Sequence, residues 1–256
     1  MIKEEELLPL FERLRLTLIR DTIDDKIIQA TKENWSYTKL LKILFTLEVE
    51  SRDQKMLEKR INKSGIDTKK TLENFDFKFN KKIPERIIKE IATMKFIKKS
   101  ENIFLIGPSG IGKSHIANAI GFEACIKNYN VINKRVTDLL DYLHAGNGDM
   151  TFEKRYKEII NTPLLILDDF GLTEINEKYQ IYLYEIMNDR YEKTSTIITS
   201  NKSFNEWINV FKNPLMANAF IDRIIHNAII LNIDEGKSYR KKLFEDKQKK
   251  LFNDII

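Results

Sequence analysis

Apolar residues along the first 62 positions recur at helical spacing. The first such stripe consists of Leu7, Leu10, Leu14 and Leu18. A longer amphipathic run extends from Tyr37 to Ile61, and Ser36 before it is a suitable N-cap. The run ends at Asn62-Lys63-Ser64-Gly65, and residues 66–80 show no helical period, which predicts an extended segment. We therefore predict a small all-helical domain over residues 1–66 and a second domain over 67–256.

The second region alternates between apolar runs of strand length and amphipathic runs of helix length. Strands are predicted at 102–107, 130–136, 164–168, 196–200 and 228–232. Helices are predicted at about 83–99, 113–128, 137–145, 151–161, 176–193, 214–226 and from about 237 onward. This alternation is typical of an α/β fold, in which a parallel sheet lies between two layers of helices.

The composition indicates a folded chain and excludes several classes of protein. Of the 256 residues, 42% are hydrophobic and 32% are charged with mixed sign. The single cysteine, Cys125, allows no internal disulfide, and the three histidines are too scattered for a zinc motif. No apolar run approaches the roughly 18 residues of a membrane span, and the acidic start, Met1 to Glu6, lacks a signal-peptide core. We expect a soluble cytoplasmic protein without membrane contact.

The positive charge is concentrated in one segment. The net charge is +5, and residues 78–100 contain eight Lys or Arg against two Glu. A basic segment of this kind suggests a polyanionic partner. The charge pattern alone equally allows a solvated helix face.

The most specific motif follows the first predicted strand. Residues 107–114 match the phosphate-binding pattern G-x-x-x-x-G-K-[ST] and precede a predicted helix. Backbone N–H groups of such a loop and the positive end of the helix bind phosphate oxygens. Lys113 is expected to reach the β- and γ-phosphates, and the Ser114 hydroxyl to ligate Mg²⁺. The predicted nucleotide-binding residues here are Gly107, Pro108, Ser109, Gly110, Ile111, Gly112, Lys113, Ser114 and His115.

Polar residues also follow two other predicted strands. The apolar strand 164–168 ends in Asp168-Asp169, and Asn201 follows the strand 196–200. Parallel strands deliver their carboxyl ends to one edge of the sheet, where ligands bind. We expect Asp168 to help hold Mg²⁺, Asp169 to activate the attacking water, and Asn201 to sense the γ-phosphate or fix the water. Taken alone, Asp168 is a common type of turn residue at a strand end, and an Asn after a strand, such as Asn201, is usually a turn residue.

Two arginines are further candidates for the catalytic site. Arg223 lies in the helix before the last predicted strand, and its guanidinium could stabilise transition-state charge on a nucleotide bound by a neighbouring subunit. An exposed arginine paired with Asp222 is the alternative. Arg240, at the start of the final helix, could contact the nucleotide of its own subunit.

Together these segments resemble the IstB type of AAA+ ATPase, the helpers of bacterial insertion-sequence transposition. The resemblance covers nearly the whole chain and includes 70–77, the phosphate loop, 164–171, 195–201, 219–224 and 236–240. It implies a chain that binds Mg²⁺ and ATP at subunit interfaces, oligomerises on duplex DNA, selects target DNA and stimulates a transposase. It also implies that Arg223 is a trans-acting arginine finger, that Arg240 is the second sensor, and that 137–161 carries an extra pore-facing helix.

One residue departs from the wider AAA+ pattern. Many AAA+ proteins have Glu at the position of Asp169, and the side chain of Asp is one methylene shorter. This difference suggests slow turnover. An inactive ATPase that only binds DNA is therefore one alternative. A replicative helicase loader that binds single-stranded DNA is another, although no cysteine precedes Cys125 to form the zinc module of many loaders.

No helix-turn-helix pattern is evident, so the candidate DNA contacts are basic residues. They are Lys55, Lys59, Arg60, Lys134, Arg135, Lys154, Arg155 and Lys157, together with the 78–100 segment. Contacts of this type go mainly to phosphates, which predicts weak sequence selectivity and strong salt dependence. A solvated surface is the alternative for each of them.

Overall fold

The computed structural model describes residues 7–211, 213–233, 236–242, 244 and 245. The chain divides into two compact units, residues 1–59 and 60–256. This division lies a few residues before the 66/67 boundary expected from the sequence, and the functional assignment of the two domains stays a prediction. The acidic residues 1–6 and most of the final basic helix lie outside the described residues.

The first unit is helical, as its apolar spacing predicts. It contains α1 (Leu8–Leu14), α2 (Thr17–Lys32) and most of α3 (Tyr37–Ser64), which ends in the second unit. The Ser36 hydroxyl accepts a hydrogen bond from the backbone N–H of Lys39 at 3.2 Å, so the predicted N-cap is confirmed. The buried Glu48 carboxylate of α3 accepts the N–H groups of Leu18 and Ile19 at the start of α2. This contact satisfies two free donors of the first turn of α2 and joins the helices.

The second unit is built on a five-stranded parallel sheet. Its strands are β1 (Asn102–Ile106), β2 (Val131–Arg135), β3 (Leu164–Phe170), β4 (Ser195–Ser200) and β5 (Ala228–Asn232). Their order across the sheet is β2-β3-β4-β1-β5, and every pair is parallel. All residues of β1 and β4 are buried, as expected for strands covered on both faces.

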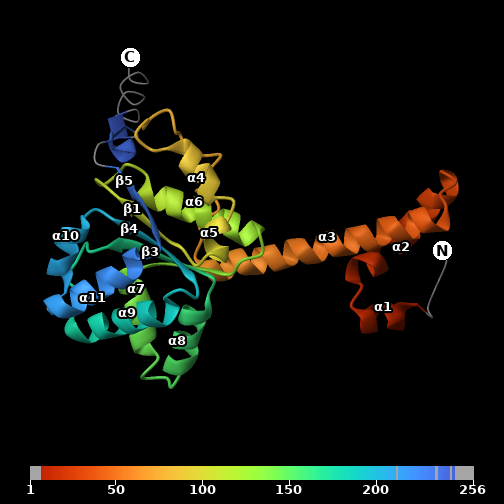
Figure 1. The fold of residues 1–256 in the computed structure, drawn as a ribbon. Helices are drawn as coiled ribbons and strands as arrows, with labels where there is room; N and C mark the ends of the chain where they lie inside the picture. The colour runs from red at the N-terminus through yellow and green to blue at the C-terminus, as the bar shows by residue number, and fades with distance from the viewer. Residues whose placement is uncertain (1–6, 212, 234–235, 243, 246–256) are drawn as a thin grey trace, which may run out of the picture. The chain divides into compact units, whose positions relative to one another are not determined.

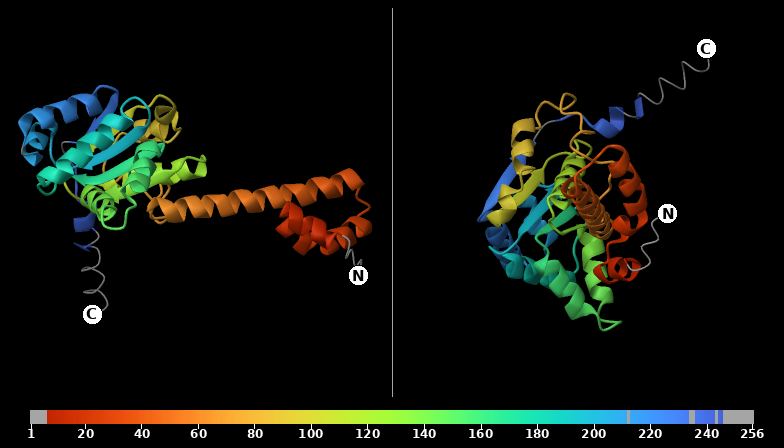
Figure 2. Two further views of the ribbon diagram at one scale, coloured as in Figure 1. Left: turned by 90° about the horizontal axis from the view of Figure 1, so that it is seen from below. Right: turned by 90° about the vertical axis from the view of Figure 1, so that its right-hand side faces the viewer.

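Helices cover both faces of the sheet, so the predicted three-layer fold is confirmed (Figures 1 and 2). On one face lies α6 (Lys113–Ile126), which lies close to the four strands β1 to β4. The other face carries α7 (Val136–Ala145), α8 (Phe152–Asn161), α9 (Glu177–Arg190), α10 (Phe204–Trp207), a 3₁₀ turn (Ile208–Val210) and α11 (Pro214–Ile225).

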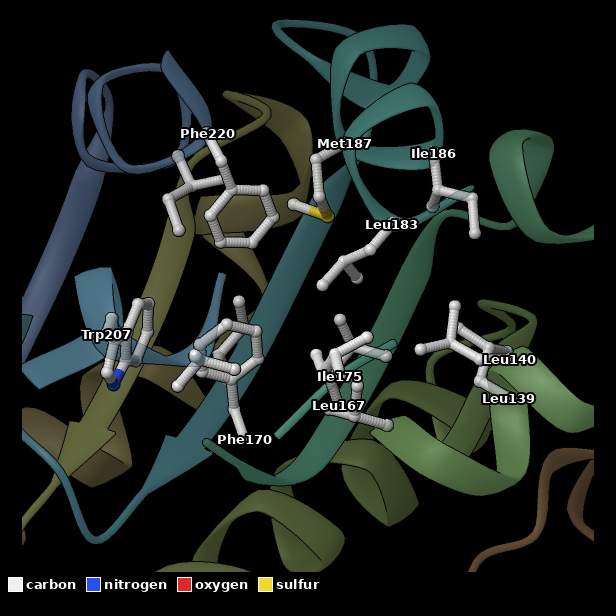
Figure 3. Close-up of a cluster of buried hydrophobic side chains, with 14 of the residues drawn as sticks. Leu139, Leu140, Leu167, Phe170, Ile175, Leu183, Ile186, Met187, Trp207 and Phe220 are labelled. Atoms are coloured by element: carbon white, nitrogen blue, oxygen red, sulfur yellow. The ribbon is translucent and has the colours of Figure 1, made fainter. Parts of the chain in front are cut away.

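The core on the second face is continuous from α7 to α11. Figure 3 shows Leu139 and Leu140 of α7 and Leu183 of α9 directed toward Leu167 of β3. At the other end of this cluster the Phe170 ring lies 4.2 Å from the Trp207 ring and stacks on Phe220 at 5.6 Å between centroids. This packing fixes the carboxyl end of β3, where the acid pair lies.

The structure corrects the single helix expected over 83–99. Two helices, α4 (Glu85–Ile91) and α5 (Lys95–Lys98), are separated by Met94, whose φ is 65°. In one continuous helix, Ile88 and Ala92 would share a face that excludes Met94 and Ile97. The break allows all four side chains to be buried.

The sequence analysis also missed α10. Its first turn has a reciprocal capping box between Ser203 and Glu206, and its Trp207 side chain is fully buried. The pattern S-x-x-E ahead of a tryptophan is the signal that could have revealed it.

Candidate functional site

The phosphate loop connects β1 to α6, as the motif predicts. Gly112 is the N-cap of α6 with a φ of 108°, a conformation that favours glycine. A Cβ atom at this position would lie 2.7 Å from the Phe75 ring. Glycine is therefore needed at Gly112 both for the backbone turn and for the close approach of a second segment.

Lys113 lies over the loop and brings in Asn201 from the end of β4. Its Nζ donates hydrogen bonds to the carbonyls of Gly107 and Pro108, both at 2.8 Å, and to Oδ1 of Asn201 at 2.5 Å. Burial lowers the pKa of Lys113 to about 8, against the opposing effect of the two nearby aspartates. The structure thus joins two predicted residues that are far apart in sequence.

The acid pair lies at the carboxyl end of β3 beside β4. Thr199 of β4 donates its hydroxyl proton to Asp168, and the backbone N–H of Asp169 donates to the same hydroxyl at 3.0 Å. The sequence analysis missed this role of Thr199, because cross-strand register is not visible in a single strand.

Asp169 adopts a left-handed backbone with a φ of 59°, where the register between β3 and β4 is irregular. Asp tolerates this conformation better than most residues because its short side chain can bond locally. The backbone therefore gives a local reason for Asp rather than Glu at this position.

A single cavity of about 450 Å³ gathers most of the predicted nucleotide site. Its lining includes Ser109 to His115, Asp169, Asn201 and Arg240. Gly107, Pro108, Asp168 and Arg223 were also predicted for the site and lie outside this lining; Gly107 and Pro108 contact it through the Nζ of Lys113.

The rest of the cavity lining, its second wall, comes from residues that the sequence analysis did not assign to the site. They are Lys70, Asn74, Phe75, Asp76, Phe79, Asn80, Arg135, Leu172 and Tyr239. The Phe79 and Tyr239 rings meet edge to face at 5.3 Å, and the backbone N–H of Tyr239 donates to the carbonyl of Gly110 at 2.9 Å. The alternation of Phe75, Phe77 and Phe79 was the available signal for this wall.

His115 connects the two walls. Its Nε2 lies 2.8 Å from the carbonyl oxygen of Thr71, and its ring meets Phe75 edge to face at 5.1 Å. His115 therefore holds the segment around Phe75 against α6. Its predicted contact with the nucleotide stays a prediction.

The donor set at the phosphate loop fits a magnesium–nucleotide complex. Mg²⁺ is usually held by one or two protein oxygens, with phosphates and waters completing its shell. The Ser114 hydroxyl and the Asp168 carboxylate are oxygens of this kind. Within the described residues, no three His, Cys, Asp or Glu side chains gather as a protein-only metal cage.

Arg223 is placed on α11, against α9. Its guanidinium lies 4.8 Å from the centre of the Tyr184 ring, a cation–π contact. Its Nη1 is buried and has no hydrogen-bond partner among the described residues. Nη1 of Arg223 therefore takes no part in an ion pair with Asp222, which was the alternative role considered for this arginine.

The candidate DNA-contacting residues differ in their exposure to solvent and in their contacts with other residues. Lys55 and Lys59 on α3 and Lys154 and Lys157 on α8 are exposed. The Nζ of Lys134 lies 5.1 Å from the Tyr142 ring centre.

Three of the predicted arginines have partners that favour other roles. Arg60 donates to the carbonyl of Cys125 at 2.7 Å, and Arg155 bonds to Asp149 and to the carbonyl of Tyr142. The Nε of Arg135 lies 3.9 Å from a carboxylate oxygen of Asp169 at the nucleotide cavity. These guanidinium groups hold the fold or face the cavity, so the exposed lysines are the stronger DNA candidates.

None of the described helices combines the length and the apolar character needed to cross a membrane.

The chain is similar in sequence to known ATP-binding proteins. Residues 10–247 match the family described as IstB-like ATP binding protein. An ATP-binding protein of insertion sequence IS5376 from Geobacillus stearothermophilus is 34% identical over 240 residues, which covers 93% of this chain and 95% of that protein. The corresponding protein of insertion sequence IS21 from Pseudomonas aeruginosa is 33% identical over 237 residues, with 93% and 89% covered.

Solved structures with the same fold are more distant in sequence. AMPPCP-bound DnaA from Aquifex aeolicus has a TM-score of 0.58 at 23% identity, over 73% of this chain and 57% of that chain. The DnaC helicase loader has a TM-score of 0.52 at 23% identity, over 59% of this chain and 88% of that chain. These structures confirm the AAA+ fold, and the sequence matches show that the chain belongs to the IstB-like ATP-binding protein family.

Proposed function

We propose that this protein is a magnesium-dependent ATPase that oligomerises on duplex DNA, selects target DNA and stimulates a transposase. The observation that carries the proposal is the single cavity that joins the phosphate loop, Asp169, Asn201 and Arg240. Its curated relatives at 33–34% identity are named as ATP-binding proteins of insertion sequences.

In this proposal the protein residues position and activate the reactants. Lys113 binds the β- and γ-phosphate oxygens, and Asn201 beside it orients the attacking water. Asp169 accepts the proton of that water as its oxygen attacks the γ-phosphorus, and the bond to the bridging oxygen breaks to give ADP and phosphate. Ser114 and Asp168 would hold Mg²⁺, which would supply positive charge beside the phosphates. Arg223 of a neighbouring subunit and Arg240 stabilise the charge that develops.

Replacing Asp169 with asparagine is expected to keep ATP binding and to lower the hydrolysis rate by about 10²-fold or more, since general-base catalysis contributes this order of magnitude. Binding is measured by fluorescence of a labelled ATP, and hydrolysis by phosphate release. Asp169→Glu keeps the carboxylate and extends it by one methylene. A hydrolysis rate equal to that of the natural protein would contradict the suggestion that the shorter side chain of Asp169 slows turnover. Full turnover in Asp169→Asn would exclude Asp169 as the base.

DNA affinity is expected to fall steeply with salt, because lysine contacts to phosphates release bound counterions. About four phosphate contacts predict a loss near 100-fold between roughly 50 mM and 200 mM salt. A Lys154→Gln/Lys157→Gln variant should bind more weakly and reduce the slope of log affinity against log salt by about 2. The exposed Lys193, changed to Gln, is a control with the same type of charge loss. An affinity that stays flat across this salt range would contradict DNA binding through these residues.

A replicative helicase loader is the second candidate, and the fold similarity to the DnaC helicase loader favours it. The two functions differ in the form of DNA that is bound. With a non-hydrolysable ATP analogue, preference for duplex over single-stranded DNA supports the first proposal, and the reverse preference supports the second.

A further inference from the structure

The acid pair forms a β-bulge near the end of β3. The register between β3 and β4 shifts after Leu167 and resumes at Phe170. Two residues of β3, Asp168 and Asp169, therefore lie opposite a single residue of β4, Thr199. A bulge changes the direction in which side chains leave a strand, and bulges are frequent beside active sites. The residue that faces the bulge can therefore control where the two acids point.

The Thr199 hydroxyl hydrogen-bonds both residues of this bulge. It accepts the backbone N–H of Asp169 at 3.0 Å, and it donates its proton to Oδ1 of Asp168. A hydroxyl can do both because it carries one donor and two acceptor lone pairs on the same atom. One buried side chain thus holds the carboxylate of the first acid and the backbone of the second.

Thr199 is separated from the cavity by the acids that it holds. Its exposed fraction is 0%, whereas Asp168 and Asp169 are both partly exposed and Asp169 lines the cavity. The left-handed backbone of Asp169, with a φ of 59°, is uncommon and persists only where its surroundings stabilise it. The bond from its N–H to Thr199 is such a stabilising contact. Any effect of Thr199 on catalysis must therefore act through the acids.

The two acids have different proposed tasks and so need different directions. A hydrogen bond to a metal-binding carboxylate fixes its orientation and raises the affinity for the metal. We propose that Thr199 is the positioning residue of the site, which directs Asp168 toward Mg²⁺ and Asp169 toward the attacking water. This inference rests on the proposed ATPase function.

The test compares Thr199→Val with the natural protein. Valine has the same shape as threonine but lacks the hydroxyl, so both hydrogen bonds are lost. Affinity for the metal is measured directly from the electron paramagnetic resonance signal of Mn²⁺, with a non-hydrolysable ATP analogue bound. We expect Mn²⁺ to bind about 10-fold or more weakly to the variant, and ATP hydrolysis with Mg²⁺ to fall by about 10- to 100-fold. Affinity for labelled ATP in EDTA should not change, because the phosphate loop is untouched.

Thr199→Ser is the conservative variant. Serine keeps the hydroxyl and lacks only the methyl group that restricts its rotation. It should therefore restore most of the Mn²⁺ affinity and most of the hydrolysis rate. If Thr199→Ser is as defective as Thr199→Val, the hydroxyl is not the group that matters and the inference is overturned.

Thr196→Val is the matched control for a purely structural role. Thr196 lies on the same strand and is also fully buried, and its hydroxyl accepts the Nε–H of Arg190 at 3.1 Å, away from the acid pair. The same substitution here should lower Tm by roughly 2–4 °C, as expected for the loss of about one net hydrogen bond. Its Mn²⁺ affinity should equal that of the natural protein.

The remaining outcomes are also decisive. Natural Mn²⁺ affinity in Thr199→Val would overturn the assignment and leave the proposed ATPase function intact. An equal loss of Mn²⁺ affinity in Thr196→Val, or a loss of ATP binding in EDTA by Thr199→Val, would show a general structural defect and overturn it as well. A natural protein that neither binds Mn²⁺ with the analogue nor hydrolyses ATP would contradict the proposed function itself.

Discussion

Replacing Arg223 with alanine is expected to leave ATP affinity nearly unchanged and to lower the rate of hydrolysis by about 10³-fold, the lower range for an arginine finger. Arg223 does not line the cavity of its own chain, so its loss removes no contact with the bound nucleotide there. Its guanidinium lies on the Tyr184 ring, and its buried Nη1 has no hydrogen-bond partner in the described part of the chain. We expect the rest of the guanidinium to reach a phosphate group bound by a second copy of the chain, because its planar fork pairs well with phosphate.

Mixing two inactive variants tests whether the site is shared. Lys113→Ala removes the phosphate-binding lysine but keeps Arg223, and Arg223→Ala has the reverse defect. If the finger acts in trans, a mixture of the two variants should recover part of the activity that each lacks, because some interfaces combine an intact loop with an intact finger.

Arg223→Lys is the conservative control. Lysine keeps the charge but lacks the planar fork, so it should restore only a minor part of the turnover. Full hydrolysis by Arg223→Ala, or no recovery in the mixture when both variants assemble, would contradict a site completed by a neighbour.

Replacing Arg190 with methionine is expected to destabilise the protein by about 3–5 kcal/mol, because several buried acceptors lose their donors together. Arg190 is 1% exposed, and burial lowers its pKa to about 9. Its guanidinium donates to the carbonyls of Ile159, Thr162 and Ser195 at 2.7, 2.8 and 2.5 Å. It also bonds the hydroxyl of Thr196 at 3.1 Å, and so joins the end of α8, the end of α9 and the start of β4.

The measurement is thermal unfolding followed by circular dichroism. For a chain of this size, about 3 kcal/mol corresponds to a fall of roughly 6–12 °C in Tm. Arg190→Lys keeps the charge but cannot reach all these acceptors, so its Tm should lie between the two. The exposed Lys193, changed to methionine, is the surface control and should shift Tm little. A Tm of Arg190→Met within a degree or two of the natural protein would show that the network does not stabilise the fold.

The core of the nucleotide site follows from local sequence. The phosphate loop has a fixed spacing of glycines and a lysine between a strand and a helix, and every part of that pattern acts within about ten residues. The acids after β3 and Asn201 after β4 were predicted from one further rule, that parallel strands end at a common edge. The five strands were predicted because apolar runs of this length bounded by polar residues are a local signal.

The second wall of the cavity depends on contacts between segments far apart in the chain. Asn80, Phe79 and Tyr239 meet there because the segment before the sheet and the segment after it both pack on the phosphate loop. The bond from Thr199 to Asp168 depends on the pairing of β3 with β4, and the cation–π contact of Arg223 depends on the packing of α9 against α11.

The sequence by itself therefore determined the fold class, the phosphate loop and the polar residues at the strand ends, because spacing and periodicity are local properties of the chain. Only the tertiary structure decided the strand order, the aromatic wall of the cavity, and the buried network of Arg190. These features arise from pairs of residues whose separation in sequence carries no information about their distance in space.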